Sequence, residues 1–337
     1  MPAVSSLVSL CPLLTDALRN TCPNFHCYDK GNIHGIMCAG QKVGVDGNTI
    51  FKACQASPIK LGDRFGKEVS LHFEEADLSC NKVFDTLVYF PSGMLDEWNP
   101  YEGLHQHTAA FMTARALNIS LEGASVGFAG LVSPHRGFPL LGLWNMTFDK
   151  VIFGSAVCAR QIIIPTSSEH SFNTWHQPTC DNKELLQDYR TWMRSFLSPL
   201  HEGGDDCFFV VVIKRPPKLR RHEENLDAFV GHIATKRFAG KKVCVRTMVP
   251  HTLTVKMQLE MISASQMLIG THGGALTWLL ALPLDGIVVE LSAKAPHYRH
   301  WAHALGVHYK SINTGIAWGT RSYSIKIEAA AREIGFT

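Results

Sequence analysis

The sequence predicts an α/β protein whose C-terminal half folds around a parallel, doubly wound sheet. From residue 208 onward, short apolar runs alternate with helical patterns of about 10 to 15 residues, which is typical of βαβ units. Residues 268–291 have the order strand, glycine turn, helix, strand. The 337 residues also exceed one typical domain, so two domains are expected.

The first part of the chain, 1–84, alternates short apolar pieces with Gly, Asn and Asp, and 44–50 has the composition of a β-hairpin. We expect small strands here, held by cysteines and packed on the domain that follows. Apolar patterns then predict strands alternating with helices. The strands are 86–90, 125–132 and 161–164, and the helices are 101–117, 140–149 and 183–197.

The alternation continues through the second half of the chain. The predicted strands are 208–213, 243–245, 267–269, 287–291 and 307–309, and the predicted helices are 225–234, 254–263, 275–282 and 297–305. The Ala/Glu/Lys/Arg-rich stretch 325–334 is also predicted to be helical. With the domain boundary placed at 198–204, the parts are an N-terminal segment (1–84), a first domain (85–203), a second domain (204–324) and a C-terminal helix (325–337).

The composition excludes several classes of protein. A hydrophobic content of 46% is ample for buried cores, while 18% charged residues and a net charge of +3 argue against a nucleic-acid binder or a disordered chain. No run of 18 consecutive apolar residues occurs, so the sequence as given is not expected to span a membrane. The mildly apolar start, 1–14, lacks a basic region, so a clipped start and a working signal peptide are equal alternatives. Membrane attachment is expected only through an anchor missing from this start.

The cysteines indicate an oxidising compartment. Six of the ten lie in the first 80 residues, and no C-x-x-C pair occurs that would suggest a zinc knuckle. The six are Cys11, Cys22, Cys27, Cys38, Cys54 and Cys80, and the others are Cys158, Cys180, Cys207 and Cys244. Disulfides are therefore expected, with unpaired buried cysteines as the alternative. The sequons that start at Asn118 and Asn145 are compatible with the secretory pathway.

The glycine turn at 270–274 is the most informative motif. It places backbone N–H groups and His272 at the start of a predicted helix, where the free amides and the helix dipole both attract an anion. The Rossmann and P-loop fingerprints do not fit. Our hypothesis is that the diphosphate of a nucleotide sugar binds there, with close packing of helix on sheet as the alternative reason for the glycines.

This motif resembles the signature of a known enzyme family. The run Gly270-Thr-His-Gly-Gly-Ala-Leu-Thr277, followed by Leu282-Pro283 and Val288-Val-Glu-Leu291, is similar to that of glycosyltransferase family 61. This inverting group includes plant core β-1,2-xylosyltransferases and the O-GlcNAc transferase of EGF-like domains. Its signature usually reads Gly-x-His-Gly-Ala-Gly-Leu-Thr, so Gly274 and Ala275 stand in swapped order here. The resemblance implies the GT-B fold, in which two Rossmann-like domains face a cleft and a C-terminal helix crosses back to the first domain.

Donor-binding residues are expected on two neighbouring loops. Five of the eight residues at 214–221 are basic, and they follow a predicted strand, at the edge where open α/β sheets bind ligands. A guanidinium there can donate two parallel hydrogen bonds to phosphate oxygens. The alternative is a solvated basic loop. The family pattern implies phosphate-binding roles for Arg215, Arg221 and Asn225, with Arg221 as the main diphosphate partner. The other expected donor contacts are His272, the amides of Gly273, Gly274 and Ala275, and Glu290.

Two of these residues have specific expected roles and specific alternatives. Glu290 ends a predicted strand, and its carboxylate can accept hydrogen bonds from ribose hydroxyls, or it can cap the next helix. His272 can donate to a phosphate or stabilise the leaving group, or it can be a hydrogen-bonded histidine of the core.

Inverting transfer also needs a base that takes the proton from the acceptor hydroxyl. Glu102 and His105 are three residues apart in a predicted helix and share a face. Family members carry an Asn and then a histidine here, followed by an acid; Asn99 and His105 are present, but no acid follows His105 at the usual place. Both residues are therefore kept as candidates, with a purely structural helix as the third option. His105 and His107 lack a third zinc ligand at a recognisable spacing, and the resemblance also implies that no metal is needed.

The sequence therefore predicts an inverting glycosyltransferase in the Golgi or ER lumen. It would move a sugar from a UDP-sugar to a hydroxyl of a glycan or glycoprotein by direct displacement, without cofactor or nucleic acid. Xylose is the first expectation because the cysteines at 22, 27 and 38 resemble those of the plant enzymes, and GlcNAc is the second. One alternative is a non-catalytic glycan- or partner-binding relative. Another is a hydrolase that pairs Glu102 with Asp96 or Glu97.

Overall fold

The structure, a computed structural model, describes most of the chain. The described residues are 18–22, 24–30, 35–46, 48–51, 58–62, 68–76, 78–80, 82–91, 100–129, 141–154, 156–165, 180–198, 206–218, 222–291, 297–312 and 322–337. They divide into two compact units, and the chain passes from the first to the second within helix α4 (Cys180–Arg194), between Leu185 and Leu186. The predicted boundary at 198–204 lies almost entirely outside the described residues.

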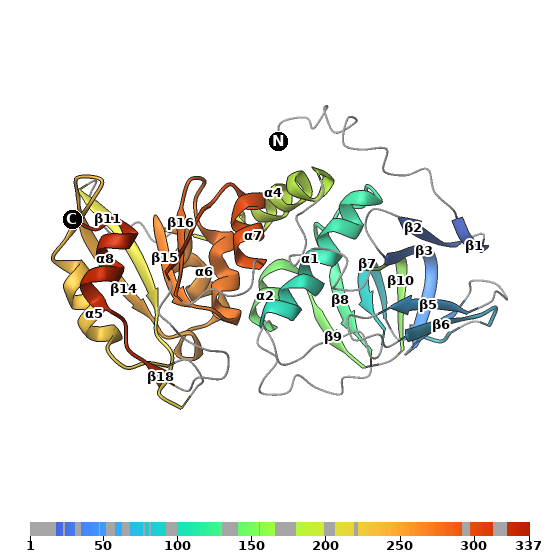
Figure 1. The fold of residues 1–337 in the computed structure, drawn as a ribbon. Helices are drawn as coiled ribbons and strands as arrows, with labels where there is room; N and C mark the ends of the chain where they lie inside the picture. The colour runs from blue at the N-terminus through green and yellow to red at the C-terminus, as the bar shows by residue number, and fades with distance from the viewer. Residues whose placement is uncertain are drawn as a thin grey trace. The chain divides into compact units, whose positions relative to one another are not determined.

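The first unit is built on a ten-stranded mixed sheet in the order β5-β6-β4-β3-β10-β7-β8-β9, with β2 pairing β3 and β1 pairing β2 (Figure 1). Its strands are β1 (Leu18–Cys22), β2 (Phe25–Lys30), β3 (Gly35–Asp46), β4 (Thr49–Phe51), β5 (Ile59–Gly62), β6 (Glu68–Glu74), β7 (Val83–Phe90), β8 (Ser125–Phe128), β9 (Val151–Phe153) and β10 (Val157–Ile164). Strands β10, β7, β8 and β9 are mutually parallel, and β3 joins them antiparallel to β10. The predicted hairpin forms as β3–β4.

Helices α1 (Pro100–Ala116) and α2 (Leu141–Thr147) follow β7 and β8, as the sequence predicted. Several strand predictions differ from the structure: β7 begins three residues before the predicted 86, and β8 ends at Phe128, before the predicted 132. Strand β9 was missed because it has only three residues, and β10 begins four residues before the predicted 161. The first half of β10 alternates buried and more exposed positions, and Arg160 and Gln161 separate its apolar start from the apolar run 162–164.

The second unit has a six-stranded sheet in the order β13-β14-β11-β15-β16-β17 (Figure 1). Its strands are β11 (Cys207–Ile213), β13 (Arg237–Phe238), β14 (Lys241–Met248), β15 (Met267–Thr271), β16 (Ile287–Leu291) and β17 (His308–Ile312). All neighbours are parallel except β13 and β14. The chain thus moves outward from β11 in both directions, which is the doubly wound topology that was predicted.

The helices of this unit are α5 (Leu226–Ala234), α6 (Val255–Ser263), α7 (His297–Leu305) and α8 (Ile327–Ile334), with short 3-10 helices η2 (Pro250–Thr252) and η3 (Gly274–Ala281). A two-stranded sheet joins β12 (His222–Glu223) to β18 (Ser322–Tyr323). Two expectations need correction. The α-helix expected at 275–282 is instead the 3-10 helix η3. Its first hydrogen bond runs from the Leu276 N–H to the carbonyl of Gly273, three residues earlier, as in a 3-10 helix. The C-terminal helix α8 packs on α5 and β17 of its own unit, because Ala330, Ala331 and Ile334 join that unit's core.

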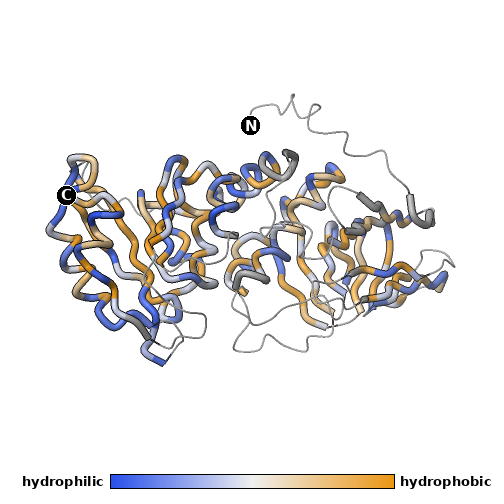
Figure 2. Tube along the Cα trace, viewed as in Figure 1, coloured by the Kyte–Doolittle hydropathy of each residue, from blue (hydrophilic) through white to orange (hydrophobic). Residues whose placement is uncertain are grey.

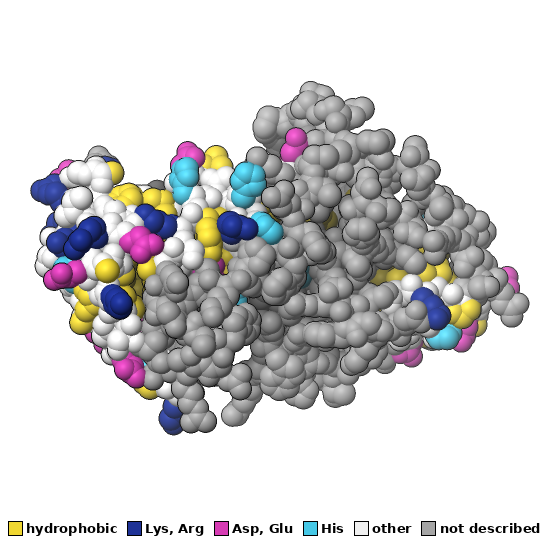
Figure 3. Space-filling model, viewed as in Figure 1, with side chains coloured by type: hydrophobic (Ala, Val, Ile, Leu, Met, Phe, Trp, Pro, Cys, Tyr) yellow, Lys and Arg dark blue, Asp and Glu magenta, His cyan; other side chains and the backbone are white. Residues whose placement is uncertain are grey.

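Each unit has its own hydrophobic core, and Figure 2 shows the hydrophobic stretches following the strands of both sheets. On the face drawn in Figure 3, the described surface of the second unit carries both positively and negatively charged side chains. That mixture agrees with the low net charge of the sequence.

Three disulfides are present among the described residues. Cys27–Cys38 joins β2 to β3, Cys80–Cys158 ties the segment before β7 to β10, and Cys207–Cys244 joins β11 to β14. Disulfide formation is thereby confirmed for these six cysteines, and it is consistent with an oxidising compartment. Cys11 and Cys54 lie outside the described residues. Among the described residues, no helix combines the length and the hydrophobicity needed to cross a membrane.

Candidate functional site

The candidate site lies where the winding of the second sheet changes direction. After β11 the chain leads to β14 on one side, and after β15 it leads to β16 on the other, although β11 and β15 are parallel neighbours. The connections therefore diverge at the carboxyl ends of these two strands, which is where open α/β sheets leave a crevice for ligands. Lys214 and Arg215 follow β11, and His272 and Gly273 follow β15.

Arg215 joins the two strand ends. Its Nη2 donates a hydrogen bond to the His272 carbonyl at 3.0 Å. Gly273 has φ 155° and ψ 172°, and a Cβ atom at this position would lie 1.9 Å from the same Nη2. A side chain at 273 would therefore both strain the backbone and displace the guanidinium. This glycine is required by the approach of Arg215.

Glycine is needed at position 270 for a different reason. A Cβ atom there would lie 2.9 Å from Ile213 Cδ1 and 3.3 Å from Leu276 Cδ2. The first glycine of the motif thus serves close packing between β15, β11 and η3. Close packing, the alternative explanation for the glycines, therefore applies at Gly270, and diphosphate binding at the turn stays a prediction.

The glycine turn is accessible to solvent only at residues 273–275. Gly273, Gly274 and Ala275 are partly exposed, whereas Thr271, His272 and Leu276 on either side are buried. The amides of the first turn of a helix have no partners within the helix. Three of the predicted donor-contact residues therefore form the accessible part of this corner.

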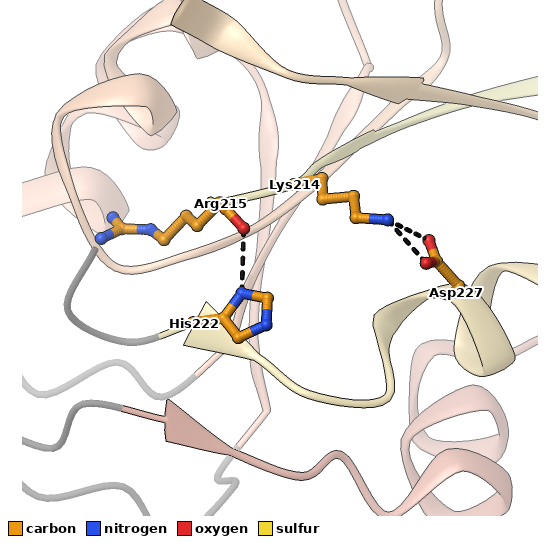
Figure 4. A network of polar contacts seen from close by, with 4 residues as sticks. All are labelled: Lys214, Arg215, His222 and Asp227. Atoms are coloured by element: carbon orange, nitrogen blue, oxygen red, sulfur yellow. Dashed lines mark hydrogen bonds and ion pairs between the residues drawn. The ribbon is translucent and has the colours of Figure 1, made fainter. Parts of the chain in front are cut away.

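Lys214 points away from the turn, although it precedes Arg215 directly (Figure 4). Its Nζ lies 2.6 Å from both carboxylate oxygens of Asp227, in the first turn of α5. On the other side of the loop, His222 Nδ1 bonds the Arg215 carbonyl at 2.9 Å. The backbone of Arg215 is thus held at the base of the loop while its side chain reaches the glycine turn.

His272 is fixed by a buried carboxylate. Its Nδ1 is hydrogen-bonded to Glu290 Oε1, and Tyr309 Oη donates to Glu290 Oε2 at 2.6 Å. Burial, and then the charge of Glu290, raise the pKa of Tyr309, so this hydroxyl remains a donor. The ring of Tyr298 meets the imidazole edge to face, with 5.4 Å between centroids.

The side chain of Glu290 is enclosed in the protein, whereas we expected it to face the donor. Its side chain has 0% exposed surface, and each carboxylate oxygen already accepts a hydrogen bond from the protein. Glu290 orients His272 from this enclosed position, and its contact with ribose stays a prediction. His272 is itself buried, with 7% exposed surface, so in this structure it is a hydrogen-bonded histidine of the core, and its contact with the donor stays a prediction.

Asn225 also has a structural partner. Its Nδ2 donates to the Ile325 carbonyl at 2.7 Å, and its Oδ1 accepts from the Ile325 N–H at 2.6 Å. This pair of bonds ties the segment before α8 to the start of α5, so the amide predicted to bind donor serves the fold. Arg221, the predicted main diphosphate partner, lies outside the described residues.

The base candidates lie on α1 of the first unit. The described helix includes both Glu102 and His105, and the Glu102 side chain is not among the described ones. His105 is 4% exposed, and every residue from 103 to 114 is buried. His107 Nε2 lies 2.8 Å from Thr147 Oγ1, and burial lowers the pKa of His107 to about 3. His107 is therefore a neutral core histidine, and the identity of the base stays a prediction.

A second cluster supports the far end of η3. Arg190 on α4 donates to the carbonyls of Leu282 and Leu305, and Arg194 donates to that of Ala281. These carbonyls end η3 and α7, where the helix dipole attracts a cation. Burial and the charge of Arg194 lower the pKa of Arg190 to about 10. A pocket of about 390 Å³ lies beside them, lined by Gln187, Arg190, Thr191, Arg194, Pro283 and Leu284.

Sequence reasoning missed the roles of Asp227, Tyr309 and Arg190. Each acts through a contact with a residue distant in the chain, and no local pattern marks such a contact. Within the described part of the chain, no group of three or more His, Cys, Asp or Glu residues is placed to hold a metal ion.

Comparisons with known proteins add little. No family model matches the sequence, and no curated protein matches it. Among solved structures, the chain resembles the bacterial iron-containing dodecameric glycosyltransferase TibC from enterotoxigenic E. coli H10407 at 11% identity and a TM-score of 0.29. The match covers 75% of this chain and 69% of that chain. A likeness at this level decides neither the fold nor the function of this chain.

Proposed function

We propose that this chain is an inverting glycosyltransferase that binds a UDP-sugar at the β11/β15 edge of the second unit. The observation that carries the proposal is the Arg215 guanidinium lying against Gly273, in the partly exposed glycine turn 273–275. The similarity of 270–277 to the family 61 signature supports the same ligand. The GT-B arrangement of the two units is part of this proposal.

The charges at the corner favour a diphosphate. A guanidinium presents several N–H groups in a planar fork, and the amides of 273–275 add donors that carry no counterion. The neighbouring cation, Lys214, is already neutralised by Asp227. A compact group with more than one negative charge can use Arg215 and the amides together, whereas a neutral sugar cannot.

The same groups would stabilise the transition state. In direct displacement, the acceptor oxygen bonds to the anomeric carbon as the bond from that carbon to the diphosphate oxygen breaks. The acceptor proton passes to a base, and negative charge develops on the departing UDP. Donors held in place before reaction stabilise such charge efficiently. Glu290 and Tyr309 hold His272 for this purpose in our proposal, and Glu102 or His105 is the base.

The compartment and the donor follow from other features. The three disulfides favour an oxidising compartment, and we propose the Golgi or ER lumen. UDP-xylose and then UDP-GlcNAc are the proposed donors, and a glycan or glycoprotein is the acceptor. The test is a panel of UDP-, GDP- and CMP-sugars, assayed for binding by calorimetry and for release of the nucleotide. Binding of UDP-sugars without release would identify the non-catalytic relative instead, and no binding at all would contradict both.

Arg215→Ala should weaken UDP binding about 10- to 100-fold, because hydrogen bonds to charged groups contribute about 1.5–3 kcal/mol. Lys214→Ala is the matched control, since it removes an adjacent charge that points at Asp227. Calorimetric titration with UDP compares the two variants. Equal losses in both would mean that only the general positive charge of the loop matters, and an unchanged Arg215→Ala affinity would exclude the assigned contact.

Glu102→Gln and His105→Ala separate the two base candidates. Loss of a general base lowers a rate by about 10²- to 10⁴-fold, whereas UDP binding should be unaffected because it depends on the other unit. Both variants should be compared with the original protein in UDP release and in calorimetric UDP affinity. If both keep the full rate, α1 has no catalytic group at these positions.

A further inference from the structure

The turn that follows α1 contains one of the two sequons. Asn118 has φ 55°, and the N–H groups of Asn118 and Ile119 bond the carbonyls of Arg115 and Ala114 at 3.1 and 2.8 Å. This is the Schellman ending of a helix, with the left-handed position occupied by asparagine in place of the more common glycine. The backbone of Asn118 completes the helix end, and its side-chain amide makes no hydrogen bond within the described residues.

Both reactive groups of this sequon lie at the surface. Asn118 and Ser120 are exposed, while Ile119 between them is partly buried. Ser120 Oγ accepts a weak hydrogen bond from the Glu122 N–H at 3.2 Å, which leaves its hydroxyl proton available as a donor. The amide and the hydroxyl that define an N-glycosylation site are therefore accessible in the folded chain.

The second sequon, Asn145-Met146-Thr147, is arranged differently. Asn145 is exposed on α2, but Thr147 is 5% exposed. The Thr147 hydroxyl donates to the Leu143 carbonyl at 2.8 Å and lies 2.8 Å from His107 Nε2. Once α2 has packed, the hydroxyl of this sequon is enclosed and already bonded.

We propose that Asn118 carries an N-linked glycan, in preference to Asn145. The disulfides are consistent with the compartment in which such transfer occurs, and the sequon supplies the acceptor. The Asn118 amide nitrogen attacks the anomeric carbon of an oligosaccharide carried on a lipid diphosphate. A carbon–nitrogen bond forms, the carbon–oxygen bond to the diphosphate breaks, and the amide loses one proton as the lipid diphosphate leaves. This modification is independent of the sugar transfer proposed above.

The test uses the full chain, directed into the secretory pathway of a eukaryotic cell and analysed by intact mass and glycopeptide mapping before and after peptide N-glycosidase. Asn118→Gly removes the acceptor but keeps a residue that suits the left-handed position, so it should fold normally and lose the glycan. Ser120→Ala should lose the same glycan with Asn118 in place, whereas Ser120→Thr should retain it.

Asn145→Gln is the matched control, and it should leave the glycan mass unchanged. A thermal unfolding curve for each variant checks that a lost glycan does not reflect a misfolded chain. An unmodified Asn118 in the folded, secreted original protein would overturn the proposal. So would occupancy at Asn145 equal to or above that at Asn118, since the enclosed Thr147 hydroxyl would then have no effect.

Discussion

Acidification from pH 7 toward pH 3 should destabilise the first unit by up to about 5 kcal/mol through His107 alone. Burial lowers the pKa of His107 to about 3 from the usual 6.5, and each unit of difference corresponds to about 1.4 kcal/mol. The unfolded chain binds a proton here below pH 6.5, while the folded chain does so only near pH 3. The stabilisation is therefore complete above pH 6.5 and is lost as the pH falls toward 3.

The measurement is hydrogen exchange of α1 peptides at pH 7 and pH 5, corrected for the intrinsic exchange rate. Over that interval the His107 contribution falls by about 2 kcal/mol. His107→Gln keeps a polar group for Thr147 but does not titrate, so its α1 should lose that much less stability than the original protein. His251→Gln, at an exposed position on η2 of the second unit, is the control. Equal acid sensitivity of α1 in all three proteins would contradict the assignment.

Arg190→Ala should lower the free energy of unfolding of the second unit by about 3–5 kcal/mol. The Arg190 side chain is 5% exposed and serves the carbonyls of Leu282 and Leu305. Its removal leaves two buried acceptors without a partner, at about 1–3 kcal/mol each, and opens a cavity. Because Leu282 caps the C-terminal end of η3, the damage should extend to the glycine turn at the other end of that helix.

Urea unfolding of the second unit measures this effect. Arg190→Lys should recover only part of the stability, since an ammonium cannot present a fork to two carbonyls at once. Arg194→Ala should cost less than Arg190→Ala, because Arg194 is partly exposed and has a single carbonyl partner. A stability of Arg190→Ala within about 1 kcal/mol of the original protein would mean that water replaces the guanidinium at both carbonyls.

The three central strands of the second sheet were predictable because they are buried on both faces. The runs 207–213, 267–269 and 287–289, which form β11 and the first three residues of β15 and β16, are apolar without interruption, so local composition identifies them. Strand β9 has only three residues, and Arg160 and Gln161 interrupt the apolar pattern of β10, so local composition identifies neither strand in full. The 3-10 form of η3 likewise depends on its packing, which the composition of the segment does not encode.

The sequence predicted which residues of the candidate site lie close together, but it did not predict which side chains form hydrogen bonds with each other. Arg215, His272 and the amides of 273–275 do lie together, because the carboxyl ends of adjacent parallel strands meet at one edge of a sheet. The contacts of Glu290 and Asn225 differed from expectation. Each side chain found an internal partner, in Tyr309 and His272 for Glu290 and in Ile325 for Asn225.

The sequence by itself determined the order of the five longer strands and the four α-helices of the second unit, and the position of its glycine turn, but not the two-residue strands β12, β13 and β18. These features depend on backbone preference and on burial pattern, which are properties of consecutive residues. Only the tertiary structure decided that Glu290 is enclosed, that Arg215 crosses Gly273 and that α8 packs on its own unit. Those outcomes depend on which strands become neighbours and in what register, and the cost of burying a charge then selects the partner that compensates it.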